Sequence, residues 1–319
     1  MSATPAPVGD LAHAFRHEAF LYAGQDEFVD GAMSFIRGAL EDDAPVLVVV
    51  SAAKLDLLRA ELGAASHEVC FADMAEVGGN PARIIPVWKD FVSERAVNGR
   101  GVRGIGEPVW AGRSPAELVE CQRHESLLNL AFAGAPGWWL LCPYDTKTLS
   151  PAVIEQAFSS HPFIMTSGGR QPSTRFRGND EAAAPFAEPL PEPPVPPYEI
   201  SFDAGHVPAV RGFVTKQAVE AGLGGLRASD FALAVHELAT NSVRYGGGHG
   251  VLRLWREPDA IVCEVRDNGR IEHPLAGRVL PAPDQDGGRG LWLVNQLCDL
   301  VQFRSLPEGN VVRVHMRRR

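Results

Sequence analysis

Paired cysteines, lysines and long apolar runs are all scarce in this sequence. The five cysteines are widely spaced and include no CxxC pair, so neither a disulfide framework nor a zinc motif is indicated. Such cysteine usage fits a reducing cytoplasm. Only four of the 30 basic residues are lysines, which is typical of a codon preference for arginine rather than of a selected basic patch.

The apolar runs that do occur are short. Residues 46–50 and 138–142 fall far below the roughly 18 residues that a membrane-spanning helix requires, and the N-terminal region has no charged-then-apolar signal pattern. A net charge of −9 argues against direct nucleic-acid binding, although three arginines stand at 317–319. We therefore expect a soluble cytoplasmic protein that binds neither membrane nor nucleic acid.

A proline-rich stretch divides the chain. With 319 residues, 45% of them hydrophobic, the sequence can form two cores. Between residues 179 and 198 seven prolines disfavour both helix and central strand; they stand at positions 185, 189, 191, 193, 194, 196 and 197. We interpret 170–197 as a linker between a domain at 15–169 and a domain at 198–319.

Before this linker, short apolar runs alternate with longer amphipathic segments. Such alternation predicts a parallel sheet that is covered by helices on both faces, an α/β domain of the RecA-like three-layer type. The expected strands are 19–23, 46–51, 68–71, 102–105 and 138–142, and the expected helices are 25–40, 54–62, 81–98, 115–130 and 151–158.

A nucleotide site in this half would need a glycine-rich loop followed by a lysine, and the sequence contains no GK[ST]. We therefore expect no ATP there. The stretches "HEAFLYAGQDEFVDGAMSFIRGAL", "GIGEPVW", "CQRHESLLN" and "LLCPYD" resemble the MEDS sensory domain, a degenerate RecA-like module. The resemblance covers residues 15–168 and implies that this half receives a signal or an unknown ligand.

Polar residues in the first domain have two interpretations each. Glu107 and Asp145 follow apolar strands, where catalytic carboxylates would lie in an active relative; they can equally be solvated acids or a relic. His124, Glu125 and Asn129 share one helix, and they either contact a ligand or form ordinary surface polarity.

After the linker the pattern changes to an α+β sandwich with helices on one face of a mixed sheet. A first helix ends at Gly222, and Ser229 and Asp230 offer an N-cap to a second helix over 231–245. Strands follow at 251–256 and 260–265, then an irregular segment over 267–286, a helix over 290–298, and two closing strands.

Three short motifs in this half suggest one site. Glu237 and Asn241 are four residues apart and share a helix face, where a carboxylate can orient a hydroxyl and an amide oxygen can bind phosphate-bound Mg²⁺. Asp267 ends a strand and can accept the amino group of adenine, and Gly269 permits close backbone approach. Gly287, Gly288 and Gly290 open a helix whose N-terminus favours phosphate oxygens.

In this order the motifs resemble the N, G1 and G2 boxes of the GHKL (Bergerat-type) ATP-binding fold, and their compact spacing resembles its anti-sigma-factor serine/threonine kinase branch. The resemblance covers 198–317 and implies ATP and Mg²⁺ as cofactors. It implies Glu237 as the catalytic base, Asn241 as the magnesium ligand and Asp267 as the adenine partner. The other nucleotide-binding positions would be Gly269, Gly287, Gly288, Arg289, Gly290 and Leu291, with a lid over 270–286.

Some positions depart from the family pattern. Ile271 stands where a second glycine is frequent, Tyr245 where the kinase branch often has histidine, and the last strand offers valines where a threonine or serine is usual. These departures leave slower nucleotide use open.

His236, directly before Glu237, raises the question of a phosphoacceptor histidine. Asp267 follows only about 30 residues later and no other ExxxN occurs, so this helix is expected to be the ATP-binding one. The leading hypothesis is an anti-sigma factor that sequesters a sigma subunit and phosphorylates a STAS-type anti-anti-sigma protein, and the resemblance suggests a homodimer. A sensor histidine kinase and an ATP-binding module without catalysis are the alternatives.

Overall fold

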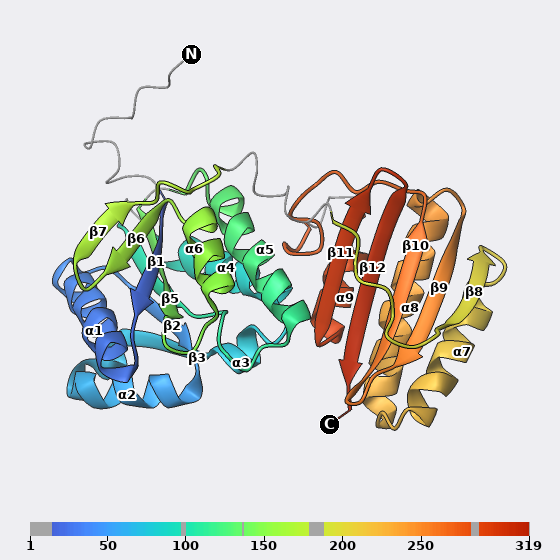
Figure 1. Cartoon of the computed structure of the whole chain (residues 1–319), viewed down its shortest axis with the longest axis horizontal. Helices are drawn as coiled ribbons and strands as arrows, with labels where there is room; N and C mark the ends of the chain where they lie inside the picture. The colour runs from blue at the N-terminus through green and yellow to red at the C-terminus, as the bar shows by residue number, and fades with distance from the viewer. Residues whose placement is uncertain (1–14, 97–99, 136, 179–187, 282–286, 319) are drawn as a thin grey trace, which may run out of the picture. The chain divides into compact units, whose positions relative to one another are not determined.

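The computed structural model describes residues 15–96, 100–135, 137–178, 188–281 and 287–318. The chain divides into two compact units, residues 1–182 and residues 183–319 (Figure 1). In the described ranges, no helix combines the length and the apolarity that a membrane crossing requires.

The first unit is built on a seven-stranded sheet of order β3-β2-β4-β5-β1-β6-β7. Neighbouring strands run parallel, except that β7 runs antiparallel to β6. The strands are β1 Arg16–Tyr22, β2 Val46–Val50, β3 Val69–Asp73, β4 Val102–Gly106, β5 Trp138–Asp145, β6 Phe163–Thr166 and β7 Gly169–Pro172. The sequence pattern does not predict β6 or β7; both are short, and every residue of β7 is exposed, so it has no apolar pattern.

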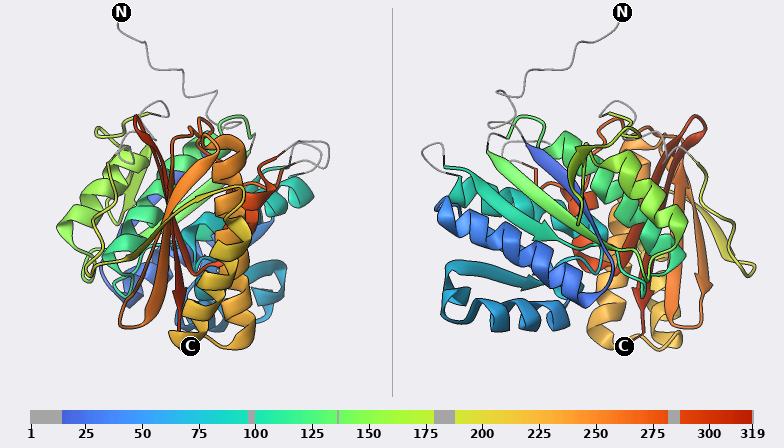
Figure 2. Two further views of the ribbon diagram at one scale, coloured as in Figure 1. Left: turned by 90° about the vertical axis from the view of Figure 1, so that its right-hand side faces the viewer. Right: turned by 60° about the vertical axis from the view of Figure 1, so that its left-hand side comes forward.

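Helices cover both faces of this sheet, as the alternating pattern predicts (Figures 1 and 2). One face packs on α1 and α2 through a cluster that includes Phe28, Ile36, Val48 and Leu141. On the other face Gly104 leaves room for Trp88 of α4, because a Cβ there would lie 2.9 Å from the ring. The helices are α1 Gln25–Glu41, α2 Ala52–Leu62, α3 Met74–Val77, α4 Ile84–Arg95, α5 Pro115–Ala131 and α6 Pro151–Ser160.

Two details of the first unit differ from expectation. The helix predicted over 81–98 begins as a 3₁₀ turn at Pro81–Arg83, and α4 ends at Arg95. The first residues of the predicted linker belong to β7. The RecA-like assignment stays a prediction, as do the domain limits at 15–169 and 198–319.

The second unit has a five-stranded sheet of order β11-β12-β10-β9-β8. Every pairing in it is antiparallel, so the expected mixed sheet is wrong. The strands are β8 Tyr198–Asp203, β9 His249–Arg256, β10 Ala260–Asp267, β11 Leu300–Leu306 and β12 Gly309–Arg317, and the helices are α7 Val207–Glu220, α8 Gly225–Tyr245 and α9 Arg289–Leu297. Of these, β8 is not predicted from the sequence.

The helices of the second unit lie on one face of its sheet, as expected (Figure 2). Alternate strand residues such as Leu252, Cys263 and Val314 form one core with Val214 of α7 and Phe231 of α8. α8 starts at Gly225, six residues before the predicted start. The predicted N-cap at Ser229 is wrong, since this residue lies inside the helix and its hydroxyl donates to the Gly225 carbonyl.

The opposite face of the sheet carries a buried ion-pair network. Glu264 Oε2 accepts from Arg313 at 2.6 and 2.9 Å, and Oε1 accepts from Arg266 at 2.7 Å and from Arg253 at 3.2 Å. Part of the proline-rich segment covers this face, because Arg313 also donates to the Pro191 carbonyl and Leu190 is buried beside β11 and β12. Residues 188–192 therefore pack as part of the second unit.

Candidate functional site

A cavity of about 310 Å³ in the second unit brings together residues from all three motifs. It lies between α8, the end of β10, the segment that follows β10, the start of α9 and the start of β12. Of the predicted site residues, Asn241, Asp267, Gly288 and Leu291 line it. The other lining residues are Leu238, Ser242, Tyr245, Gly246, Val265, Arg270, Ile271, Glu272, His273, Ala276, Asn310 and Val312.

Asp267 is held by donors from three elements. Its Oδ2 accepts from the Ser242 hydroxyl of α8 at 2.6 Å, and its Oδ1 accepts from the Gly269 amide at 2.9 Å and from Asn310 Nδ2 at 3.1 Å. Asn310 stands directly opposite Asp267 in the β10–β12 pairing, so the strand register sets this contact. A carboxylate has about four acceptor positions, so a further donor can bind from the cavity.

Two glycines make this arrangement sterically possible. A Cβ at Gly269 would lie 2.6 Å from the Tyr245 carbonyl oxygen, and one at Gly246 would lie 2.5 Å from Asp267 Cγ. The end of α8 and the turn after β10 therefore approach each other more closely than any other residue would allow.

Glu237 and Asn241 meet the start of α9 at Gly290. A Cβ at Gly290 would lie 3.0 Å from both Glu237 Oε2 and Asn241 Nδ2. Glu237 therefore lies next to the cavity, although it is not one of the residues that line it. The ExxxN pair and the glycine motif come together as the sequence suggests.

The remaining glycine-motif residues form the entry to α9. Gly287 and Gly288 have φ of 88° and 81°, a left-handed backbone that favours glycine, and Gly288 is the N-cap of the helix. Arg289 is the first helical residue and is exposed. Residues 282–286 of the predicted lid lie outside the described residues.

The sequence did not reveal Ser242 or Asn310. Ser242 falls within the apolar stripe of α8, so the sequence pattern indicates a core position. Its hydroxyl also lies 3.1 Å from the Leu238 carbonyl oxygen. Asn310 extends the contact to the segment after β10, because its Oδ1 accepts from the Ile271 amide at 3.3 Å and from the Ser305 hydroxyl at 2.9 Å. Asn310 thus contacts Asp267 from the strand where the family pattern has threonine or serine.

The chemistry of the cavity fits an adenine nucleotide. Leu238, Val265, Ile271, Leu291 and Val312 offer apolar surface to a planar base, and the Asp267 carboxylate offers an acceptor for its amino group. The amide of Asn241 lies beside the start of α9, and an amide oxygen and a helix N-terminus are groups that suit a phosphate-bound metal and phosphate oxygens.

His236 lies on α8, the helix that carries Glu237 and Asn241, but it does not line the cavity. α7 and α8 both pack into the core beneath the sheet of the second unit. Within the described residues, His236 is therefore part of the sandwich and does not stand on a separate helical hairpin.

In the first unit, the two strand-end acids differ in environment. Glu107 is buried and accepts from the Tyr22 hydroxyl at 2.8 Å, and it also pairs with Lys54. Burial raises the pKa of Glu107, and the Lys54 charge opposes that rise. Asp145 is half-buried and accepts from the Lys147 amide at 3.0 Å and the Thr148 hydroxyl at 3.1 Å. Glu107 is therefore part of a buried side-chain network and not a solvated acid, whereas Asp145 holds the turn that follows β5.

The helical trio of the first unit is buried. His124, Glu125 and Asn129 are at most 6% exposed, so their interpretation as ordinary surface polarity is wrong. Glu125 and Asn129 both contact His17 of β1, at 3.0 and 3.1 Å.

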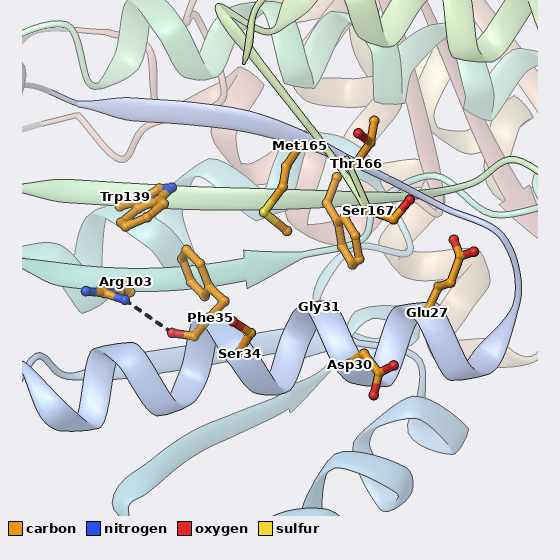
Figure 3. A pocket seen from close by; sticks show the side chains of 11 residues that line it. Glu27, Asp30, Gly31, Ser34, Phe35, Arg103, Trp139, Met165, Thr166 and Ser167 are labelled. Atoms are coloured by element: carbon orange, nitrogen blue, oxygen red, sulfur yellow. Dashed lines mark hydrogen bonds between the residues drawn. The ribbon is translucent and has the colours of Figure 1, made fainter. Parts of the chain in front are cut away.

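A second cavity, of about 420 Å³, lies in the first unit between α1 and the sheet (Figure 3). Trp139, Phe35 and Arg103 lie toward one end of it, and Glu27 and Asp30 toward the other. Its lining combines the apolar Phe35, Trp139 and Met165 with the charged Glu27, Asp30 and Arg103.

Two family models match the chain, each over part of its length. Residues 16–162 match the model described as MEDS, the MEthanogen/methylotroph, DcmR Sensory domain. Residues 200–316 match the model described as a histidine kinase-like ATPase domain. No curated protein gives a significant match. The chain thus combines a MEDS domain with a histidine kinase-like ATPase domain, and the second match implies ATP binding.

Proposed function

We propose that the protein is a signal-responsive anti-sigma regulatory factor, which binds ATP with Mg²⁺ in its second unit and phosphorylates an anti-anti-sigma protein on serine or threonine. The observation that carries the proposal is the convergence of Asp267, Asn241 and the start of α9 on one cavity. Phosphoryl transfer depends mainly on positioning and charge neutralisation, which this arrangement offers.

Each motif then has one role. Asp267 accepts the amino group of adenine, while Ser242 and Asn310 keep its carboxylate oriented. Asn241 is the magnesium ligand, and Gly287, Gly288, Arg289 and Gly290 bind phosphate through the N-terminal turn of α9. Bound ATP supplies the phosphoryl group. Glu237, beside Asn241, orients the acceptor hydroxyl and takes its proton.

The partners follow from the same proposal. The second unit sequesters a sigma factor, uses a STAS-type anti-anti-sigma protein as its phosphate acceptor, and forms a homodimer. The first unit receives the signal, which agrees with its match to a sensory domain and with its cavity beside α1.

A phosphotransfer assay tests the proposal. The full chain is incubated with γ-labelled ATP, Mg²⁺ and candidate STAS-domain proteins, and the labelled residue is mapped. Glu237→Gln should lower transfer by roughly 10²- to 10⁴-fold while ATP still binds, because only the proton acceptor is lost. Asp230→Asn changes another acid of α8, two turns away, and should leave transfer unchanged.

The alternatives give different results in this assay. A sensor histidine kinase would yield an acid-labile phosphohistidine on the protein itself, and His236→Gln would abolish it. A binding module without catalysis would retain ATP affinity and show no difference between wild type and Glu237→Gln. Either outcome would overturn the kinase assignment.

A further inference from the structure

Four side chains of types that can bind metals converge inside the first unit, far in sequence from the residues that line the cavity of the second unit. His17 of β1, Glu125 of α5, Cys142 of β5 and His161 at the end of α6 place their ligand atoms within 4.8 Å of one another. All four are at most 1% exposed. We call these four residues the His17 cluster.

The hydrogen bonds of His17 direct one ring nitrogen into the cluster. Asn129 Nδ2 donates to the Ser160 carbonyl at 2.7 Å, which turns Asn129 Oδ1 toward His17 Nδ1 at 3.1 Å. Because an amide oxygen only accepts, Nδ1 of His17 carries the proton. The lone pair of Nε2 in the neutral ring therefore faces Glu125 Oε2 at 3.0 Å and Cys142 Sγ at 3.4 Å.

His161 repeats this arrangement. Its Nδ1 lies 2.9 Å from the Ala157 carbonyl oxygen, which again only accepts, so that nitrogen is the donor. Its Nε2 lies 3.3 Å from Glu125 Oε2, the same oxygen that faces His17. Histidines that bind metals usually donate their other N–H to a protein oxygen in this way.

Without a cation, the cluster brings three acceptor groups together in a buried space, and the Cys142 thiol and the Tyr144 hydroxyl are the donors beside Glu125. Two imidazole lone pairs point at one carboxylate oxygen, and Glu125 Oε1 accepts no hydrogen bond of good geometry. Protonating both rings would put two positive charges on rings whose centroids are 4.1 Å apart. Such like charges are costly at this distance when shielded from water.

We propose that the His17 cluster binds one transition-metal ion, Zn²⁺, through His17 Nε2, His161 Nε2, the Cys142 thiolate and the Glu125 carboxylate. Two imidazoles, a thiolate and a carboxylate are ligands that Zn²⁺ takes in tetrahedral sites. The two anionic ligands balance the charge of the ion, so the buried site becomes neutral.

The distances agree with four-coordinate binding. Metal–ligand bonds of about 2.0–2.3 Å in a tetrahedron separate neighbouring ligand atoms by roughly 3.3–3.7 Å. The separations of 3.0, 3.3 and 3.4 Å lie near this range, and the wider separations in the cluster, which reach up to 4.8 Å, must shorten when the ion binds. Four protein ligands leave no open position for substrate, so the ion cross-links β1, β5, α5 and α6 and stabilises the first unit rather than catalysing a reaction.

Metal analysis of the full chain tests the proposal. Cys70→Ser serves as the background, because Cys70 is the exposed cysteine. After chelator treatment, Zn²⁺ is added back and quantified, and Co²⁺ is added separately as a spectroscopic probe. We expect one ion per chain and a thiolate-to-cobalt charge-transfer absorption with the d–d intensity of a tetrahedral site.

Matched substitutions locate the ion. Cys142→Ser should abolish the charge-transfer absorption, and His161→Gln should weaken Zn²⁺ affinity at least tenfold. Cys121→Ser is the control, since Cys121 is equally buried in the same unit and bonds the Pro108 carbonyl instead. Circular dichroism checks that each variant folds.

If His161→Gln fails to fold, the Co²⁺ spectra of the Cys70→Ser chain and of the cysteine variants still test whether the cluster binds the ion. No charge-transfer absorption in the Cys70→Ser chain, or the same metal content and spectrum in Cys142→Ser as in Cys121→Ser, would overturn the proposal. Neither result bears on ATP, so this test fails or succeeds independently of the proposed kinase activity.

Discussion

The Asp267 carboxylate receives hydrogen bonds from α8, from the turn after β10 and from β12. Because three elements fix its two oxygens, the acceptor is oriented before any nucleotide enters. Such preorganisation favours a ligand that presents an N–H donor at that point, as adenine does and guanine at the same position does not.

Asp267→Asn therefore tests the base contact at the scale of one residue. The substitution keeps the size but replaces one acceptor oxygen by a donor, so ATP affinity should fall by about 10- to 100-fold, the value of a hydrogen bond to a charged group. Calorimetry with ATP and GTP measures both affinity and base preference. Asp259→Asn, in the exposed β9–β10 turn, should leave both unchanged; an equal loss in the two variants would contradict the assignment.

Among single residues, the sequence identifies those that stand in a local motif. Glu237 and Asn241 share a helix face by spacing, and Asp267 with Gly269 forms one turn. Ser242 and Asn310 cannot be identified from local motifs. Ser242 lies in the apolar stripe of α8, and the contact of Asn310 with Asp267 depends on the register of β12 against β10. The His17 cluster cannot be predicted from any local motif, because His17 is separated in sequence from Glu125 by 108 residues and from Cys142 by 125 residues.

At the scale of elements, the start of α9 lies against the polar face of α8. Gly290→Ala would place a methyl group 3.0 Å from both Glu237 Oε2 and Asn241 Nδ2, which are the mobile ends of side chains. The fold should absorb this with a stability change below about 1 kcal/mol. Phosphoryl transfer should fall by about 100-fold, the cost of a misplacement near 1 Å.

Gly212→Ala is the matched control for that substitution. Gly212 lies in α7, and a Cβ there meets no atom within 4 Å. It should leave transfer unchanged and stabilise the helix by up to about 1 kcal/mol. Thermal unfolding and the phosphotransfer assay separate the two effects; equal transfer rates in both variants would remove α9 from the proposed site.

The face of the second sheet that carries no helices is held by charge as well as by apolar packing. Glu264 is fully buried, and its two oxygens pair with three arginines. Glu264→Ala would leave these arginines without their buried anion and should destabilise the second unit by about 3–5 kcal/mol. Hydrogen exchange of peptides from β10 and β12 measures this loss of stability in the second unit separately from the first.

Glu199→Ala provides the contrast. Glu199 lies 3.7 Å from Arg253 and its side chain is 62% exposed, so its loss should cost less than about 1 kcal/mol. If both variants exchanged at the wild-type rate, the network would contribute nothing to the sheet.

The periodicity of the sequence predicts most of these elements but not their edges. Amphipathic segments such as 25–40 and buried runs such as 46–51 appear within a residue of the predicted limits, because burial on one face leaves a helical period and burial on both faces leaves a continuous apolar run. β6, β7 and β8 are short or exposed edge strands, and their pairing partners are set by tertiary structure. The antiparallel order of the second sheet is likewise a property of topology rather than of any local pattern.

At the scale of the whole molecule, the two proposed sites belong to different compact units. A ligand in one unit changes affinity in the other only if it binds two states of the chain unequally, and such coupling is reciprocal. A regulator with a sensory unit requires this property. Whether the His17 cluster takes part in this coupling, in addition to stabilising the first unit, is a separate question that can be measured from either end.

We expect ATP affinity to differ between the Zn²⁺-loaded and the chelator-treated chain by about 5- to 150-fold, the usual range of allosteric coupling. Zn²⁺ affinity should change by the same factor when saturating ATP and Mg²⁺ are present, since the thermodynamic cycle closes. Titration calorimetry in both directions measures the two factors. Cys142→Ser should bind ATP with one affinity whether or not Zn²⁺ is added, whereas Cys121→Ser should behave as wild type. Equal ATP affinities with and without bound Zn²⁺ in the wild-type chain would mean that the ion stabilises the first unit and carries no signal to the second.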